Sequence, residues 1–168
     1  MKFKFLSLLI AILLLSACSY PEPHSERERL IQQLQTKGVS VNTVGETVDI
    51  ILPSDQAFNE GSANLVNKYQ PILKDVASLL KTYILVSVQV TGYSDLPADY
   101  QSLQALTAKQ AQQVASYLWQ HGIDARLVYS AGGANSKPVL AGASSTKTSA
   151  NRRVEVVFRY YPPVSYYD

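Results

Sequence analysis

The sequence is short of the residue types on which covalent cross-links and catalytic centres depend. Its 168 residues include one cysteine, one methionine, one tryptophan and two histidines. A single cysteine cannot form an intramolecular disulfide, which excludes a disulfide-stapled scaffold. The histidines, His24 and His121, lack metal-ligand spacing, and no serine or cysteine lies in a nucleophile motif. We therefore expect no metal, no cofactor and no enzymatic activity.

An excess of charge of one sign is also missing. The chain has 15 basic and 13 acidic residues, and two of the lysines lie in the first four positions. Without them the charges balance at 13 and 13. A neutral chain without a basic stripe lacks the electrostatic footprint of nucleic-acid binding, so no nucleic-acid partner is expected. The hydrophobic share of 46% and the charged share of 17% are typical of a globular domain, and the length suits one domain with targeting material.

The N-terminus has an apolar run, but one too short to cross a bilayer. Two lysines precede the run Phe5–Leu15, and small residues follow it. A membrane-spanning helix needs about 20 apolar residues, so residues 1–17 are predicted to be a cleaved secretion signal. Leu15-Ser16-Ala17 directly before Cys18 resembles a bacterial lipobox. The resemblance implies cleavage before Cys18 and acylation of its thiol; the alternative is a chance cysteine beside an ordinary cleavage site.

The residues after the cysteine indicate where the lipid would be placed. Ser19 follows Cys18, whereas an aspartate there would favour retention in the inner membrane. The lipobox resemblance therefore implies an outer-membrane lipoprotein whose domain faces the periplasm. Two or more acyl chains anchor a protein stably. Residues 18–25, with two prolines, are predicted to be a short extended tether.

The remaining pattern predicts an α+β domain over residues 26–160, with helices on one face of a mixed parallel and antiparallel sheet. Ser25 and Glu28 match a capping box that opens the first helix, and Gly45-Glu46 marks a hairpin. In the strand over 84–91, Ile84, Val86, Val88 and Val90 are expected to share the buried face. The expected helices are 26–37, 68–81 and 103–121, and the expected strands are 39–44, 47–52, 84–91, 127–131 and 152–160. Loops are expected at 92–102 and 132–150.

Several short motifs, in order along these elements, resemble the OmpA C-terminal family, which includes the peptidoglycan-associated lipoprotein. The resemblance covers about residues 38–160 and is carried by four motifs in a fixed order. They are Phe58-x-x-Gly61-Ser62-Ala63, Gly92-Tyr93-Ser94-Asp95, Gly132-Gly133 with Lys137-Pro138, and Asn151-Arg152-Arg153-Val154-Glu155-Val156. The resemblance implies the OmpA-like fold and association with peptidoglycan.

In that family a loop aspartate and a helix arginine clamp the zwitterionic end of diaminopimelate in the peptidoglycan stem peptide. Asp95 matches the loop aspartate, whereas Gln110 stands at the position of the helix arginine. A guanidinium binds a carboxylate in a bidentate manner, and losing that contact weakens binding. The candidate site consists of Tyr93, Ser94, Asp95, Gln110, Arg152 and Arg153.

Each candidate also has a structural interpretation. Asp95 could form an Asx-turn after its strand, and Ser94 suits turn chemistry better than nucleophilic attack. Arg152 and Arg153 could supply the missing cation, although such arginines more often form structural ion pairs. Gln110 could hydrogen-bond a stem peptide, but we expect it to be a solvent-facing helix residue.

Two functional hypotheses follow. In the first, acyl chains hold one end of the protein in the outer membrane and the domain binds the stem peptide. In the second, the protein is a structural subunit of an envelope-spanning complex, since its layout also resembles the DotK/IcmN lipoproteins of type IVB secretion systems. The tail over residues 161–168, rich in tyrosine and proline, is either a docking strip for other envelope proteins or a disordered end.

Overall fold

The computed structural model describes residues 25–140 and 149–162. The predicted signal, Cys18, most of the tether and most of the tail lie outside these residues. In the part of the chain that is described, no helix is both long enough and apolar enough to cross a membrane.

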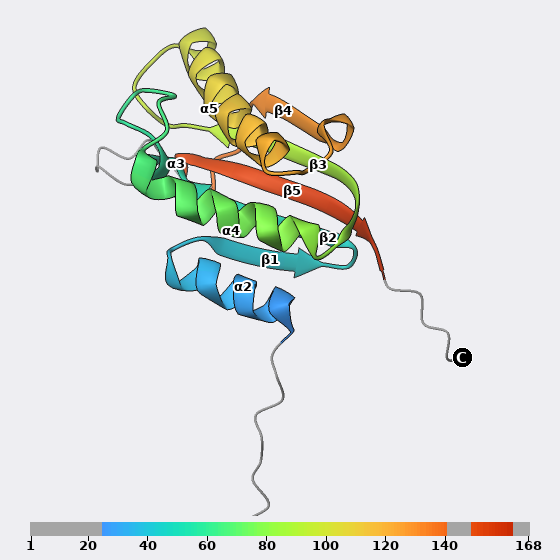
Figure 1. The fold of residues 1–168 in the computed structure, drawn as a ribbon. Helices are drawn as coiled ribbons and strands as arrows, with labels where there is room; N and C mark the ends of the chain where they lie inside the picture. The colour runs from blue at the N-terminus through green and yellow to red at the C-terminus, as the bar shows by residue number, and fades with distance from the viewer. Residues whose placement is uncertain (1–24, 141–148, 163–168) are drawn as a thin grey trace, which may run out of the picture.

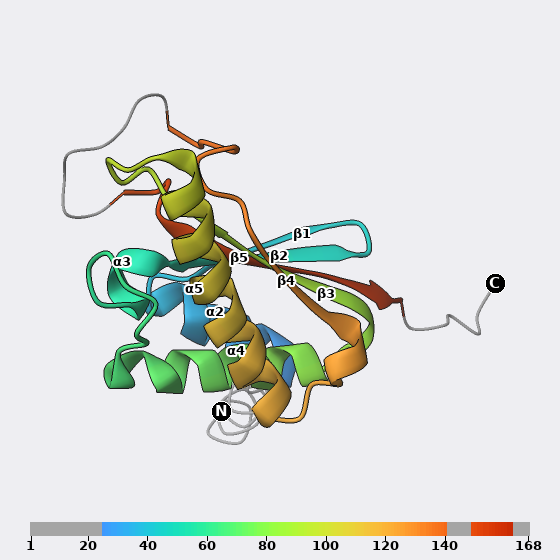
Figure 2. The same cartoon turned by 90° about the horizontal axis from the view of Figure 1, so that it is seen from above.

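A five-stranded sheet with the strand order β1-β2-β5-β3-β4 forms the centre of the domain. Neighbouring strands are antiparallel except β3 and β4, which are parallel. Helices α2, α4 and α5 cover one face of the sheet, as Figures 1 and 2 show from two directions. The predicted α+β class and the mixed sheet with helices on one face are therefore confirmed.

In chain order the elements are α2 (Glu26–Thr36), β1 (Ser40–Val44), β2 (Thr47–Pro53), α3 (Ser54–Ala57), η1 (Asn67–Tyr69), α4 (Gln70–Lys81), β3 (Ile84–Tyr93), α5 (Tyr100–Gln120), η2 (Ala125–Leu127), β4 (Val128–Gly132) and β5 (Arg153–Tyr161).

Local sequence explains where the first helix begins. The Ser25 hydroxyl accepts a hydrogen bond from the Glu28 amide, and the Glu28 carboxylate accepts one from the Ser25 amide at 2.9 Å. This reciprocal pair satisfies two amides that the first helical turn leaves without partners. The predicted capping box is confirmed.

Alternation along the two central strands builds the core. Val48, Ile50 and Leu52 of β2 are fully buried beneath the helices. The strand β5 contributes its own alternating set, which pairs with β2 in register. Because successive side chains of a strand point to opposite faces, one face of each strand enters the core.

The prediction of which β3 side chains are buried is confirmed for the second half of the strand and wrong for the first half. Val88 and Val90 are fully buried, but Ile84 is 68% exposed. The register of β3 against β5 shifts between Leu85 and Ser87, so Val86 is an extra residue in the ladder. Such a bulge reverses the alternation, and Leu85 packs against the core in place of Ile84.

Two further expectations about boundaries need correction. The strand β3 continues to Tyr93, and α5 begins at Tyr100, so the loop expected at 92–102 is reduced to residues 94–99. Asp99 caps α5, since its carboxylate accepts hydrogen bonds from the Ser102 amide at 2.9 Å and the Ser102 hydroxyl at 2.6 Å. Those bonds lower the pKa of Asp99 below its ordinary value. The short helix α3 was not expected.

Candidate functional site

The candidate residues lie at the end of the sheet where β3 finishes and β5 starts. Tyr93, the last residue of β3, is paired with Arg153, the first of β5. The loop from β3 to α5 and the helix α3 lie at this same end (Figure 1). Antiparallel pairing of β5 with both β2 and β3 therefore places α3, the Asp95 loop and the segment before β5 next to one another.

Asp95 is held by the segment that precedes β5. Its carboxylate accepts hydrogen bonds from the Ser149 hydroxyl at 2.7 Å and the Asn151 amide at 3.2 Å. It also forms an ion pair with the Arg152 guanidinium at 2.8 Å, and the Asp95 side chain is 8% exposed. These partners are more than fifty positions away in the sequence. Asp95 thus has a long-range role that a local Asx-turn does not describe.

Arg152 joins two aspartates from different elements. Its Nη1 bonds to Asp95, while its Nε lies 2.8 and 3.0 Å from the two carboxylate oxygens of Asp55 on α3. Burial acts to lower the pKa of Arg152, but the bonds and charges of Asp55 and Asp95 outweigh it and raise that pKa. The guanidinium is therefore a permanent cation between two carboxylates, and the three groups together carry formally one negative charge.

Arg153 takes part in a separate cluster on the other face of the sheet. Its Nη2 lies 2.7 Å from Glu155, and its guanidinium stacks 4.3 Å from the centre of the Tyr93 ring. The Lys137 amine bonds to the other oxygen of Glu155 at 3.2 Å. Arg153 is 2% exposed and Arg152 is 5% exposed, so both arginines are buried in ion pairs.

Tyr93 and Ser94 shape the start of the loop after β3. Burial raises the pKa of the Tyr93 hydroxyl, whose ring covers Arg153. The Ser94 hydroxyl accepts a hydrogen bond from the Leu96 amide, which is the turn chemistry expected for it. Gly133 packs against Tyr93 so closely that a β-carbon there would lie 2.4 Å from the ring. A side chain at Gly133 would therefore displace Tyr93 from the loop.

Gln110 is buried, which corrects the expectation that it faces solvent. It is 5% exposed, and its amide nitrogen donates to the Ser62 carbonyl at 2.8 Å. That carbonyl can only accept, so the amide oxygen of Gln110 must point the other way. In residues 25–140 and 149–162 this oxygen has no hydrogen-bond partner although it is buried, and the same holds for the Ser54 hydroxyl. Both residues line a hollow of about 20 Å³ beside Arg152 and Asp55.

A larger cleft opens on the other side of Ser94 and Leu96. Its volume is about 290 Å³, and its lining includes two charged residues, Asp95 and Lys137. The remaining lining residues are Tyr93, Ser94, Leu96, Pro97, Ala134, Asn135, Pro138 and Asn151. The hydrogen bond to Glu155 raises the pKa of Lys137, so the amine stays charged at neutral pH. The cleft is thus lined by one acidic and one basic residue.

The contacts of two residues in this region, Asp55 and Lys137, were not predicted from the sequence. Asp55 lies 97 positions from Arg152, so no local spacing could connect them. Lys137 was noted within a family motif, but nothing in the sequence shows that its side chain is 62% exposed at the cleft. Among the described residues, no three His, Cys, Asp or Glu side chains gather as a metal site would require.

The fold is that of a known protein family. Residues 57–152 match the model of the OmpA family, and the chain belongs to that family. The resemblance inferred from the four motifs is therefore confirmed.

Relatives of known name agree with this assignment. The chain is 29% identical over 131 residues to the probable lipoprotein YiaD of Escherichia coli, covering 78% of this chain and 60% of YiaD. It is 24% identical over 167 residues to the peptidoglycan-associated lipoprotein of Buchnera aphidicola, covering 94% and 96%. Among solved structures, the cell wall anchor of the type VI secretion system of Pseudomonas aeruginosa superposes with a TM-score of 0.70 at 27% identity, covering 79% of this chain and 96% of the anchor.

Proposed function

We propose that this protein is an outer-membrane lipoprotein, acylated at Cys18, whose OmpA domain binds the peptidoglycan stem peptide in the cleft beside Asp95 and so links the membrane to the cell wall. Support comes from relatives that are named as a peptidoglycan-associated lipoprotein and as a cell wall anchor. Further support comes from the lipobox resemblance around Cys18.

The observation that carries the proposal is the pairing of opposite charges in one cleft. The free end of a diamino acid such as diaminopimelate carries an ammonium and a carboxylate on one carbon. Asp95, in a cluster with one net negative charge, is suited to the ammonium. A cation is then needed for the carboxylate, and Gln110 cannot supply it.

Lys137 is the residue we assign to that carboxylate. Arg152 and Arg153 are buried in ion pairs, whereas Lys137 is 62% exposed at the cleft wall and bonds to Glu155 through one hydrogen bond. An ammonium is a mobile point charge with three donors, so Lys137 can bind a ligand without releasing Glu155. This arrangement would replace the helix arginine of the family with a lysine from a different loop.

Sedimentation with purified peptidoglycan tests the assignment on the acylated mature protein in detergent. Wild type is expected to sediment with the sacculus. Lys137→Gln should weaken binding about tenfold, which corresponds to ~1.4 kcal/mol. The matched control is Lys109→Gln, which removes an exposed lysine from α5 outside the cleft lining and should bind like wild type.

The variants also separate the site from the fold. Asp95→Asn should abolish sedimentation, but it also weakens a buried ion pair, so its circular dichroism must match that of wild type before it is counted. Lys137→Gln carries little such risk because its side chain is mostly exposed. If Lys137→Gln binds peptidoglycan as well as wild type does, the proposed role of Lys137 is rejected. If wild type does not bind peptidoglycan, the proposed function is rejected.

A second candidate function is favoured by the likeness to the type VI secretion anchor. In this alternative the domain is a structural subunit of an envelope-spanning secretion complex, such as a type IVB system, and the altered helix position reflects a weakened ligand site. Isolation of the acylated protein from native envelopes distinguishes the two. Co-purification with a large outer-membrane assembly, together with no sedimentation with peptidoglycan, would favour the complex.

A further inference from the structure

The end of the sheet opposite the cleft exposes apolar side chains. Val44, Ile84 and Tyr161 are 79%, 68% and 62% exposed, and we call these three residues the tether-end surface. Ile84 and Tyr161 are paired across β3 and β5, and Val44 ends β1 beside the hairpin turn. The β3 bulge described above turns Ile84 outward, so this exposure is built into the strand.

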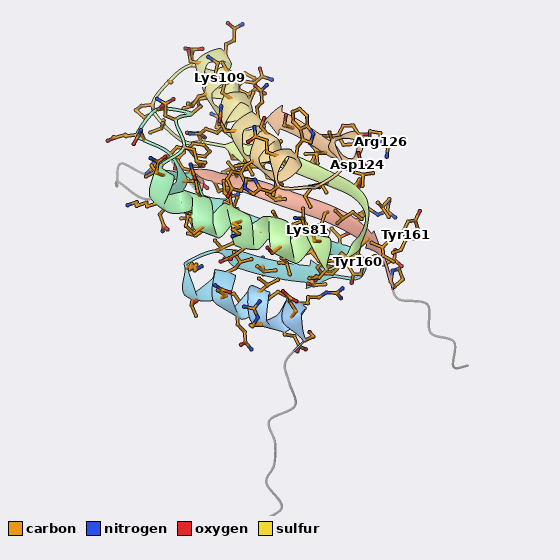
Figure 3. The ribbon with its side chains drawn as sticks, viewed as in Figure 1. Lys81, Lys109, Asp124, Arg126, Tyr160 and Tyr161 are labelled. Atoms are coloured by element: carbon orange, nitrogen blue, oxygen red, sulfur yellow. The ribbon has the colours of Figure 1, made fainter. Side chains whose placement is uncertain are left out.

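Below this surface the end of the domain is rigidly packed. The Tyr83 ring lies 4.9 Å from Phe158 and 4.7 Å from Tyr160. The Tyr160 amide donates to the Glu46 carbonyl at 3.2 Å, and its hydroxyl donates to the Gly45 carbonyl at 3.3 Å. The hairpin turn is thus tied to the end of β5. Figure 3 shows Tyr160 and Tyr161 together at this end.

The helix that follows the predicted tether starts at this same end. The Arg27 guanidinium stacks 3.8 Å from the centre of the Tyr83 ring and donates to the Thr82 hydroxyl at 3.2 Å and to the Thr82 carbonyl. Seven residue steps separate Cys18 from Ser25, and a fully extended chain of that length spans at most about 25 Å. An acylated Cys18 would therefore keep the tether-end surface close to the bilayer.

We propose that the tether-end surface rests in the headgroup region of the phospholipid bilayer that holds the acyl chains. The inference depends on the acylation of Cys18 in the proposed function. Aliphatic side chains and tyrosines are favoured at a membrane interface, where the ring is buried and the hydroxyl stays wet. Among the exposed charges nearby, Lys81 and Arg159 outnumber Glu46 by one, so charge contributes little and apolar contact would supply most of the attachment.

The strand direction then orients the cleft. The strand β3 runs from Ile84 at the tether end to Tyr93 at the cleft, and ten residues of strand span roughly 30 Å. A bilayer at the tether end therefore leaves the cleft pointing away from the membrane, toward the wall. A short tether and a docked domain would together fix the height at which the cleft is presented.

Fluorescence quenching in vesicles tests this orientation on the acylated protein. Acylation blocks Cys18, so Ile84→Cys introduces one free thiol that can carry an environment-sensitive fluorophore. The protein is reconstituted in vesicles of phosphatidylethanolamine and phosphatidylglycerol that contain headgroup nitroxide lipids. The matched control is Lys109→Cys, an exposed position on α5 far from the tether end (Figure 3).

We expect quenching at position 84 to exceed that at position 109 by about twofold or more, because interfacial side chains reach roughly 5–10 Å into the headgroup boundary. Replacing Tyr161 by Ser in the labelled protein should reduce the quenching at position 84. Equal quenching at the two positions would overturn the proposal. Protection of position 84 in native envelopes but not in vesicles would also overturn it, in favour of a protein partner.

The labelling and quenching experiments give a different result if the proposed function is wrong than if only the membrane contact of the tether-end surface is wrong. If Cys18 is not acylated, wild-type protein takes up the thiol label and does not float with vesicles, whichever surface faces the membrane. If Cys18 is acylated but peptidoglycan is not bound, the quenching comparison still applies unchanged.

Discussion

The two ends of the domain depart from the usual distribution of side chains in different ways. At the cleft end, charges are buried, with Asp55, Arg152 and Asp95 joined between three segments. At the tether end, apolar side chains are exposed and a cation is stacked on a tyrosine. Burial of charge requires accurate pairing, whereas a group of exposed apolar side chains gains free energy if a second surface covers it. The comparison agrees with the proposals made above, in which the cleft end binds a ligand and the tether end attaches to the membrane.

The largest effect on stability is expected at the buried ion cluster. Arg152→Gln leaves two carboxylates with little exposure and without their cation, which should lower the free energy of unfolding by about 3–5 kcal/mol. Urea denaturation followed by circular dichroism measures the loss. Arg126→Gln is the matched control, because its pair with Asp124 involves an 89% exposed guanidinium, and it should leave the midpoint unchanged. Equal behaviour of the two variants would show that the cluster does not stabilise the fold.

A smaller effect is expected where α2 meets the tether end. Arg27→Ala removes the stacking on Tyr83 and the bonds to Thr82, and should cost about 1–2 kcal/mol of unfolding free energy. Arg29→Ala serves as the control, since Arg29 is 58% exposed and its partners among the described residues, Glu26 and Gln33, lie on the same helix. The same denaturation experiment compares them. A cost at position 29 as large as at position 27 would indicate loss of helix stability in general.

Asp49, on the open face of the sheet, provides a pH-dependent test of the charges near the cleft end. Burial first and the charge of Glu155 second raise its pKa above 3.8, and within the described chain its buried Oδ1 has no hydrogen-bond partner. Because the pKa of Asp49 is higher in the folded state than in the unfolded state, folding favours the protonated carboxyl. The contribution of Asp49 to the free energy of unfolding is therefore fully present at low pH and is lost as pH rises through the folded-state pKa. Asp49→Asn should therefore be more stable than wild type at neutral pH, with the difference vanishing below about pH 3.8. A difference that stays constant across this range would exclude the titration of Asp49 as its cause.

The smallest effect is expected at the tether-end surface. Ile84→Ala and Tyr161→Ala should change the free energy of unfolding by no more than about 0.5 kcal/mol, because both side chains are mostly exposed. Val88→Ala in the same strand is the matched control and should cost about 2 kcal/mol or more, since Val88 is fully buried. Thermal unfolding compares the three. A large loss at position 84 would mean that its role is in folding and not in attachment.

Much of the fold could be predicted because its signals are local. The capping box at Ser25, the hairpin at Gly45-Glu46 and the alternation in β2 depend on residues a few positions apart, and the structure confirms them. The errors occur where local signals conflict with packing. Ile84 belongs to a run that alternates in the sequence, but the bulge at Val86 reverses its side. Asp99 and Ser102 form a local helix cap. The sequence prediction missed it because it started this helix at residue 103 instead of Tyr100.

The candidate site could be predicted only in part. The family motifs grouped Asp95, Arg152 and Tyr93 in one candidate site, and the structure brings the three residues together at one end of the sheet. The motifs did not show that Arg152 is shared with Asp55, nor that Lys137 is the exposed cation. Both facts depend on contacts between segments far apart in the sequence.

The sequence by itself determined the family, the order of the elements and the residues available to the cleft, since periodicity, caps and turn residues act over short distances along the chain. The tertiary structure decided which charges are neutralised, which polar atoms are buried and which apolar side chains remain exposed. Gln110 shows the reason, because its burial depends on the loop that carries Ser62, which lies 48 positions away. Electrostatic and solvation energies depend on distances in space, and only the packed chain sets those distances.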